Sequence, residues 1–291
     1  MAREPLAQRI THTDPAKYRP SKAVHEGPGQ LDYMALADFH TLDTNLYFMH
    51  RGIIEPKSGI GAHFHNQCEE MFVIFTGAAE FTIDGRTSSV TAPAGAPTRM
   101  HSMHAIYNPS DKPVEWMNIN VSALKGTYDA FNLGDGRVGA ALDRIPVFMV
   151  MRLDRGLLRS VNAMYGGKGA VQYRRPLDTT IFLGPWAYVD QLLVPQGASV
   201  GAHLHREVAE LYYVMSGQGT VTVSAQGTPS ETVPIRAGDA IPIQLGDIHS
   251  FENPGTEPLE FMVVGVSRTS EKRVDVVEAG ANGRGGRRGG N

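Results

Sequence analysis

Short runs of hydrophobic and β-branched residues recur along the chain, separated by polar turns, and they predict β-strands. In the first half these runs cover residues 46–54, 70–75, 79–83 and 114–121, and in the second half 187–194, 211–215, 220–223 and 259–266. Turn sequences such as Asp84-Gly85 and Ala237-Gly238-Asp239 punctuate them. Many short strands at this spacing favour an all-β sandwich or barrel.

The chain contains an internal repeat. The pattern Gly-Ala-His-x-His, with a glutamate five residues after the second histidine and a glycine seven residues later, occurs twice, at His63, His65, Glu70 and Gly77 and at His203, His205, Glu210 and Gly217. Further on, His104 with Asn108-Pro109 recurs as His249 with Asn253-Pro254. A repeat of this size indicates two copies of one β-domain.

The repeat and the glycine-rich stretches divide the chain into five predicted segments, and a length of 291 residues suits two domains. We expect an N-terminal arm over 1–39, domains over 40–123 and 179–270, an interdomain connection over 124–178 with an edge strand near 147–152, and a flexible glycine- and arginine-rich tail over 271–291. In the tail, the Arg-Gly-Gly units at Arg284 and Arg288 either are solvated or contact RNA.

Composition excludes several classes of function. Hydrophobic residues make up 42% and charged residues 20% of the chain, as in an ordinary globular protein. A formal net charge of −3 provides no field that would attract nucleic acid or an anionic membrane. The single cysteine, Cys68, cannot form an internal disulfide, and no signal peptide or spanning segment is evident. We therefore expect a cytoplasmic protein that acts on a small molecule.

The repeated residues suit a metal site. On a strand, alternate side chains share a face, so the histidines of His-x-His point to one ion. Glu70 lies an odd number of residues after His65, so residues 66–69 must turn to bring the carboxylate back. His104 then arrives from a third strand; His101 competes with it, but the match of His104 to His249 favours His104. A lone His-x-His is commonly a structural pair, but two complete sets argue for metal.

These motifs resemble those of the cupin superfamily, and specifically its two-domain bicupins, over roughly residues 40–122 and 180–267. The leading glycine of the first motif is present as Gly197 but is Lys57 in the first half, and the second motif has unusual spacing. The resemblance implies two double-stranded β-helix (jelly-roll) barrels. It also implies one divalent metal per domain, with iron(II) or manganese(II) favoured and zinc, nickel, copper and cobalt compatible. By analogy with this fold, we expect a homodimer.

Three further side chains are candidates for catalysis. Arg99 could hold a carboxylate or enolate oxygen, or be a solvated loop residue. His101 could contact substrate at the barrel mouth, or simply occupy a turn. Tyr212 could be a general acid or base, or a buried packing residue. Counting by twos, Phe72 and Ile74 should face the first cavity, and Tyr212 and Val214 the second; Glu69 should be exposed.

The metal sets are compatible with several activities. We expect a dioxygenase-type oxidoreductase that acts on a small enolisable or polyhydroxylated compound with dioxygen as co-substrate. The alternatives are a non-redox isomerase or lyase, and a non-enzymatic binding or storage bicupin. Because the residues around the two sets differ, we expect one site to dominate catalysis. The sequence favours the first, which has Arg99 and His101 nearby.

Overall fold

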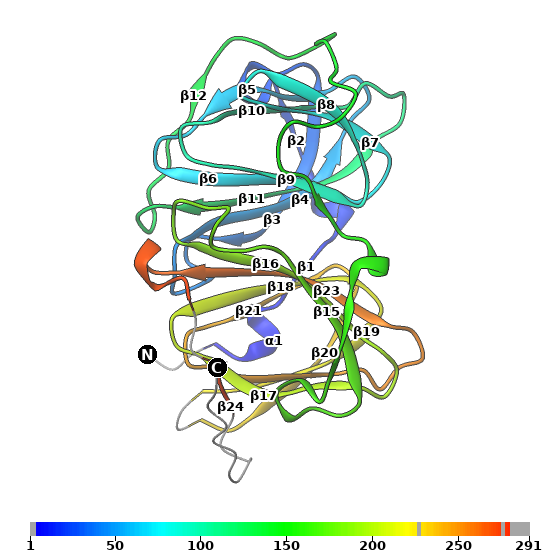
Figure 1. The fold of residues 1–291 in the computed structure, drawn as a ribbon, viewed down its shortest axis with the longest axis vertical. Coiled ribbons are helices and arrows are strands. Elements are labelled where there is room, and N and C mark those ends of the chain that lie inside the picture. Colours follow the sequence, from blue (N-terminus) through cyan, green and yellow to red (C-terminus); the bar gives the residue numbers. More distant parts are fainter. Residues whose placement is uncertain (1–3, 226–227, 275–276, 280–291) are drawn as a thin grey trace.

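The structure, a computed structural model, describes residues 4–225, 228–274 and 277–279. It consists of two β-barrels stacked along the long axis of the molecule (Figure 1). The elements of the first half are α1 (Leu6–Arg9), β1 (Thr11–His12), η1 (Pro15–Lys17), β2 (Arg19–Lys22), η2 (Val24–Glu26), β3 (Gln30–Asp38), β4 (Leu46–Ile54), β5 (Gly59–Phe64), β6 (Cys68–Ile74), β7 (Ala78–Ile83), β8 (Arg86–Thr91), β9 (Ala94–Thr98), β10 (Met103–Tyr107), β11 (Val114–Ser122) and β12 (Phe131–Asn132).

The second half repeats this order of elements. They are β13 (Met151–Arg152), η3 (Arg155–Leu157), β14 (Arg159–Asn162), η4 (Met164–Gly166), β15 (Ala170–Leu177), β16 (Trp186–Val194), β17 (Ser199–His205), β18 (Val208–Ser216), β19 (Gln218–Ser224), β20 (Glu231–Arg236), β21 (Asp239–Ile243), β22 (Ile248–Glu252), β23 (Leu259–Ser267), η5 (Ser270–Lys272) and β24 (Val277–Ala279).

Each barrel is made of two antiparallel sheets. In the first barrel the sheets have the orders β13-β9-β6-β11-β4-β3-β2 and β12-β5-β10-β7-β8, and in the second β1-β21-β18-β23-β16-β15-β14 and β20-β19-β22-β17-β24. Apolar residues fill the interior of each barrel, around Phe81 and Trp116 in the first and around Phe251 and Phe261 in the second. The predicted all-β architecture with two jelly-roll barrels is confirmed.

The repeated glycines at the end of the first motif have a backbone reason. Gly77 and Gly217 both have positive φ, of 67° and 81°, where a side chain is strained. A Cβ on Gly217 would also lie 2.3 Å from the carbonyl oxygen of Pro258. Glycine therefore permits the tight turn that returns the chain from the glutamate strand.

The first 39 residues differ from the predicted arm. Strands β2 and β3 belong to the large sheet of the first barrel, whereas Leu6 is buried in the core of the second barrel and β1 pairs with β21 there. Figure 1 shows this dark blue α1 beside the lower barrel. The repeat therefore begins near residue 11, because β1, β2 and β3 correspond to β13, β14 and β15.

The two barrels exchange their first strands. While β1 joins the second barrel, β13 pairs with β9 of the first, with Met151 opposite Gly95. The predicted edge strand over 147–152 is thus present but limited to two residues. The rest of the predicted connection over 124–178 is not a simple linker either, because it contributes β12 to the first barrel and β14 and β15 to the second.

The largest apolar cluster lies between the barrels. Their seven-stranded sheets face each other and bury Met49, Met117, Trp186, Leu211 and Met262, among others, in one common core. The barrels are therefore joined by a continuous apolar interface, which fixes the two candidate sites relative to one another.

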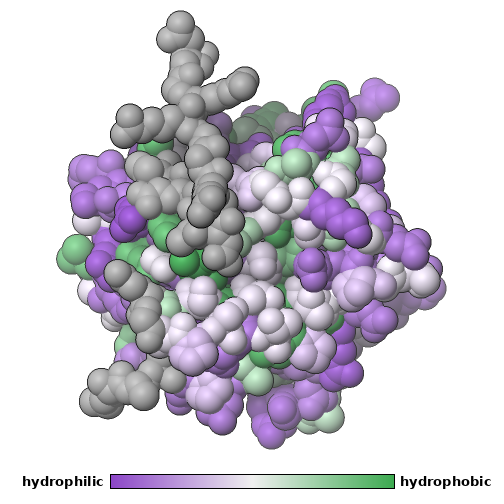
Figure 2. All heavy atoms as spheres, turned by 90° about the horizontal axis from the view of Figure 1, so that it is seen from below, coloured by the Kyte–Doolittle hydropathy of each residue, from purple (hydrophilic) through white to green (hydrophobic). Residues whose placement is uncertain are grey.

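Near the C-terminus, β24 pairs with β17 at the edge of the small sheet, although the sequence predicted a flexible tail from residue 271. Arg284 and Arg288 lie outside the described residues. Viewed from the end of the second barrel, the rim is mainly polar, with small apolar areas between (Figure 2). Among the described residues, no helix has the length and apolarity needed to cross a membrane.

Candidate metal centres

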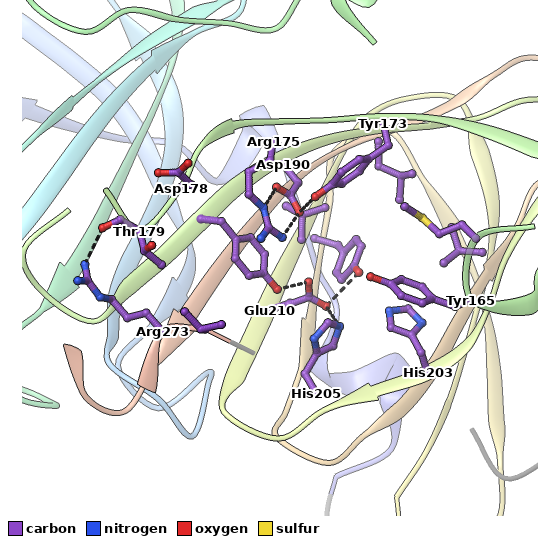
Figure 3. A pocket seen from close by; sticks show the side chains of 17 residues that line it. Tyr165, Tyr173, Arg175, Asp178, Thr179, Asp190, His203, His205, Glu210 and Arg273 are labelled. Atoms are coloured by element: carbon purple, nitrogen blue, oxygen red, sulfur yellow. Dashed lines mark hydrogen bonds and ion pairs between the residues drawn. The ribbon is translucent and has the colours of Figure 1, made fainter. Parts of the chain in front are cut away.

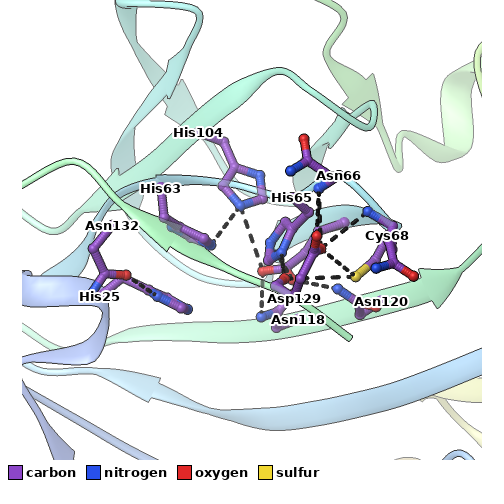
Figure 4. A network of polar contacts seen from close by, with 12 residues as sticks. His25, His63, His65, Asn66, Cys68, His104, Asn118, Asn120, Asp129 and Asn132 are labelled. Carbon is purple, nitrogen blue, oxygen red and sulfur yellow. Dashed lines mark hydrogen bonds and ion pairs between the residues drawn. The ribbon is translucent and has the colours of Figure 1, made fainter. Parts of the chain in front are cut away.

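The first cluster lies between the two sheets of the first barrel (Figure 4). His63 lies in β5 and His65 directly follows that strand, His104 comes from β10, its neighbour in the small sheet, and Glu70 comes from β6 in the large sheet. All four side chains are buried, and one ligand atom from each lies within 4.8 Å of the others. The turn that brings Glu70 back is short, because β6 already begins at Cys68.

Hydrogen bonds to the backbone orient the imidazoles. The Nδ1 of His63 donates to the carbonyl oxygen of Gly61 at 2.8 Å, and that of His65 donates to the carbonyl oxygen of Asp129. The Nε2 atoms face the cluster, and the Nε2 atoms of His63 and His104 lie 2.8 Å apart. Metal-binding histidines in proteins are oriented in this way, so the residues fit a metal.

The charge states of the first cluster also suit a cation. Burial lowers the pKa of His63 to about 3, so this imidazole is neutral. Burial alone would raise the pKa of Glu70, but His65 and then the other histidines outweigh it and hold that pKa well below its usual value. Burial lowers the pKa of His65, but Cys68 and Glu70 raise it to about 11. Metal binding would therefore release a proton from His65.

The second cluster has the same arrangement in the second barrel, and Figure 3 shows three of its four residues, His203, His205 and Glu210. His203 and His205 come from β17, His249 from β22 and Glu210 from β18, and all four are buried. The Nδ1 of His203 donates to the carbonyl oxygen of Gly201 at 2.8 Å. Glu210 Oε2 lies 3.2 Å from His205 Nε2 and 3.3 Å from His249 Nε2. This donor set fits a metal as well as the first does.

The fold and the two clusters agree with comparisons against known proteins. A family model described as "Cupin domain" matches residues 50–120 and 191–265, which together make half of the chain. The chain belongs to the cupin family. Because both barrels match, this cupin is a bicupin.

A curated relative and several solved structures are similar to this bicupin. The oxalate-binding protein of Thermotoga maritima is 33% identical over 116 residues, which are 40% of this chain and 92% of that protein. Oxalate decarboxylase from Bacillus subtilis at pH 4.6 aligns with a TM-score of 0.62 and 16% identity, over 89% of this chain and 76% of that one. The formate complex of Lactobacillus farciminis oxalate decarboxylase gives 0.64 and 15%, over 92% and 88%. These structures share the fold.

The two clusters of the bicupin differ in what holds the glutamate. In the first barrel, the amides of Asn118 and Asn120 donate to Glu70 Oε1 and Oε2 at 2.8 and 2.7 Å. In the second, the phenols of Tyr188 and Tyr212 donate to Glu210 Oε1 and Oε2 at 2.8 and 3.0 Å. Burial and then the charge of Glu210 raise the pKa of both phenols well above its usual value. Both phenols therefore stay protonated.

A glycine makes room for one of these phenols. Gly265 lies opposite Glu210 on β23, where the first barrel has Asn120 opposite Glu70. A Cβ on Gly265 would lie 2.5 Å from two ring atoms of Tyr188. The exchange of amide for phenol therefore requires a small residue at this place in the second barrel.

We expect Gly265→Ala to destabilise the protein by about 1–3 kcal/mol, because a methyl group is forced into a packed ring. Urea unfolding would measure the loss. In a Tyr188→Ala background the ring is gone, so the same Gly265→Ala change should cost much less. Equal costs in both backgrounds would show that the ring is not the obstacle.

Besides the partners of the two glutamates, the sequence reasoning missed two rings that stack on the histidines of the clusters. The ring of His25 stacks on His63 at 3.7 Å between centroids, and that of Tyr165 stacks on His203 at 3.9 Å. Both come from single 3₁₀ turns in which they adopt positive φ, 49° and 51°. Their shared offset of 140 residues was the signal that could have found them.

The cavities beside the clusters differ in size. The first, of about 100 Å³, is lined by His25, Tyr33, His50, Glu70, Asn118 and Tyr128, among others. The second, of about 370 Å³, reaches from His203, His205 and Glu210 to Tyr165, Tyr173 and Arg175. Only the second of these two has the volume for a substrate of several non-hydrogen atoms.

The candidate catalytic residues are placed differently from one another. Tyr212 lines the second cavity, with its hydroxyl 3.4 Å from His249 Nε2. Arg99 does not line the first cavity; it donates to the carbonyl oxygens of Thr180 and Ile181. His101 is also outside that cavity, exposed in a turn with positive φ, where its Nδ1 is 3.1 Å from Asn66 Oδ1. Arg99 and His101, on which the preference for the first site was based, therefore make their contacts outside its cavity.

Among the other expected lining residues, the structure places Phe72 beside His104, with centroids 4.9 Å apart. The expectation for Glu69 was wrong. Its carboxylate is buried and accepts the N–H groups of Leu183 and Gly184 at 2.7 and 2.8 Å. Glu69, like Arg99, holds the segment that leads into β16, so both residues serve the junction between the barrels.

Proposed function

We propose that this bicupin is a metal-dependent enzyme whose chemistry takes place in the second barrel. The cavity of about 370 Å³, which opens onto His203, His205 and Glu210, is the observation that carries the proposal. The first cavity, at about 100 Å³, has space only for a few molecules of the size of water. The first cluster then binds metal mainly as a structural element.

The proposed reaction is dioxygenase-type oxidation of a small enolisable or polyhydroxylated compound, in which both oxygen atoms of dioxygen enter the product. Iron(II) or manganese(II), one per barrel, suits this reaction, and the donor set also accepts zinc, nickel, copper or cobalt. When bound, such an ion supplies open positions that polarise a substrate oxygen and can accept dioxygen.

The protein's own residues supply orientation and exclusion of water. The phenols of Tyr188 and Tyr212 hold both oxygens of Glu210, which fixes the carboxylate for one geometry. Tyr165 stacks on His203 and closes one wall of the cavity. Tyr212 lies between Glu210 and His249, where its hydroxyl could donate a proton to a substrate oxygen.

A second candidate is non-redox lyase or isomerase chemistry at the same site. The similarity to proteins described as oxalate decarboxylases and an oxalate-binding protein favours it. One similar structure, at 18% identity and a TM-score of 0.63, is of Mn(II) centres in the Bacillus subtilis oxalate decarboxylase. A manganese lyase would use the same cavity. In either case the expected partner is a small molecule, and we retain a cytoplasmic location and a homodimer as predictions.

Elemental analysis of the purified protein, followed by turnover screening with and without oxygen, tests both candidates. We expect about two metal ions per chain, and loss of turnover after chelation with recovery on adding iron(II) or manganese(II). Turnover that consumes oxygen supports the dioxygenase, whereas equal turnover under argon supports the lyase or isomerase. A protein that takes up no transition metal under any of these conditions would contradict both.

A further inference from the structure

The second cavity contains a guanidinium that is held in a fixed position. Arg175 Nε and Nη2 donate to Asp190 Oδ1 and Oδ2 at 2.7 and 2.9 Å, and the buried Asp190 also accepts the hydroxyl of Tyr173 at 3.0 Å. The guanidinium carbon lies 3.7 Å from the ring centroid of Tyr188. Because the hydroxyl of Tyr188 donates to Glu210, the ring of Tyr188 connects Arg175 to the metal cluster. Figure 3 shows Arg175 and Asp190 on the same side of the cavity as Glu210.

Part of this guanidinium remains available to a ligand. Asp190 occupies the edge formed by Nε and Nη2, whereas Nη1 donates to none of the described residues. The side chain of Arg175 is 40% exposed and lines the cavity. An arginine presents several donor edges, so its terminal edge can bind a carboxylate while its side edge is held by Asp190.

The first barrel has no counterpart of this group. At the same offset of 140 residues, Arg175, Asp190 and Tyr188 correspond to Ala35, His50 and Phe48. Both barrels have an irregularity at this point of the ladder, between Ala35 and Ala37 and between Arg174 and Leu177. The bulge is therefore common to both barrels, whereas Arg175 and its contacts Asp190 and Tyr188 have no equivalent in the first barrel.

The charges around the second cavity indicate what it can neutralise. Two cationic side chains, Arg175 and Arg273, and three carboxylates, Asp178, Asp190 and Glu210, line it. The carboxylates thus exceed the cations by one, and a divalent ion on the histidines would reverse this to one excess positive charge. A ligand with a single negative charge balances the loaded site, whereas a dianion overcompensates it.

Apart from the cluster histidines and Thr179, the remaining walls are aromatic or apolar. They include Tyr165, Leu192, Val200 and Val263. Such walls favour a ligand with an apolar or aromatic body over a small, fully polar one.

We infer that the second barrel binds a monocarboxylate with an apolar or aromatic body, anchored by Arg175 through its carboxylate and directing an oxygen at its other end toward the three histidines. This inference rests on the proposed function for the location of the substrate. It narrows the substrate class and assigns Arg175 as the residue that selects the acid over its uncharged analogue.

Calorimetric titration of the full chain tests this, with its manganese content measured, using 4-hydroxybenzoate as the probe and 4-hydroxybenzamide as its uncharged analogue. We expect the acid to bind about 10-fold or more tightly than the amide, because charge-assisted hydrogen bonds are lost with the amide. In Arg175→Gln/Asp190→Asn, which removes the pair without leaving a buried charge, this preference should disappear. Arg175→Lys keeps the ion pair but not the second donor edge, so the preference should fall there too, even where the double variant does not fold.

The matched control is Arg86→Gln/Asp143→Asn, which removes an exposed arginine–aspartate pair in the first barrel and should leave the preference unchanged. Equal binding of acid and amide, no binding of the acid, or a preference that survives in both Arg175 variants would overturn the inference. Because the readout is binding, a protein that binds the acid in this way but turns nothing over would refute the proposed function and leave the anchor intact.

Discussion

Glu210→Gln should reduce turnover by about 100-fold or more, while Glu70→Gln should leave most of it. A glutamine in place of Glu210 removes the anionic ligand and presents an amide to the phenols of Tyr188 and Tyr212, so both the ligand and its support are lost. The same change at Glu70 affects a cluster beside a cavity of about 100 Å³, which is too small for substrate. The measurement is turnover at equal protein concentration, with the metal content of each variant determined.

Each variant should retain one metal ion and the circular dichroism of the parent, which serves as its folding control. A reversed pattern, with the larger loss in Glu70→Gln, would move catalysis to the first barrel. Equal partial losses in two folded variants that each hold one metal would show two equivalent active sites. We expect the two sites to differ in activity because their surroundings differ. Glu70 is held by two amides, whereas Glu210 is held by two phenols and has an arginine nearby.

Deleting residues 1–12 should lower the free energy of unfolding by about 3–5 kcal/mol, because the second barrel loses part of its core. Leu6 is fully buried there, its N–H donates to Glu231 Oε2 at 2.7 Å, and β1 pairs with β21. His12 Nδ1 is 2.6 Å from Asp239 Oδ1. For a protein of this size the loss corresponds to about 5–8 °C in melting temperature, which calorimetry would measure.

The matched control is deletion of the twelve residues 280–291, which we expect to be neutral because a glycine- and arginine-rich segment has little apolar surface to bury. Leu6→Ala alone should reproduce much of the N-terminal effect, at about 2–5 kcal/mol. An N-terminal deletion that unfolds at the parent's temperature would show that α1 and β1 contribute nothing to the second barrel.

The sequence predicted the barrels and identified the residues of both histidine–glutamate clusters, because those residues recur as a local pattern. Strand periodicity places His63 and His65 on one face, and the repeat of His104 as His249 selects it over His101. The partners of Glu70 and Glu210 could not be found in this way. They come from strands far away in sequence. Because the two barrels use different residue types at these places, the partners do not appear as a repeat.

The strand exchange was missed for a similar reason. The pairing of β1 with β21 joins residues about 230 apart in the chain, for which hydrophobic periodicity gives no signal. A signal did exist in the repeat, since Ala23, Gly27, Gly29 and Tyr33 recur at an offset of 140 as Ala163, Gly167, Gly169 and Tyr173. Extending the repeat to these residues would have moved the start of the first barrel well before residue 40.

The exchange of β1 and β13 gives the chain the form of a strand-swapped dimer whose two protomers are joined end to end. In a dimer of identical chains, symmetry requires that any substitution appear in both sites at once. Fusion removes this constraint and makes the association of the two halves independent of concentration. One half can then preserve a tightly enclosed centre that supports the partner barrel, while the other half evolves a wider cavity. Glu70 among amides and Glu210 among phenols are consistent with such a divergence after gene duplication.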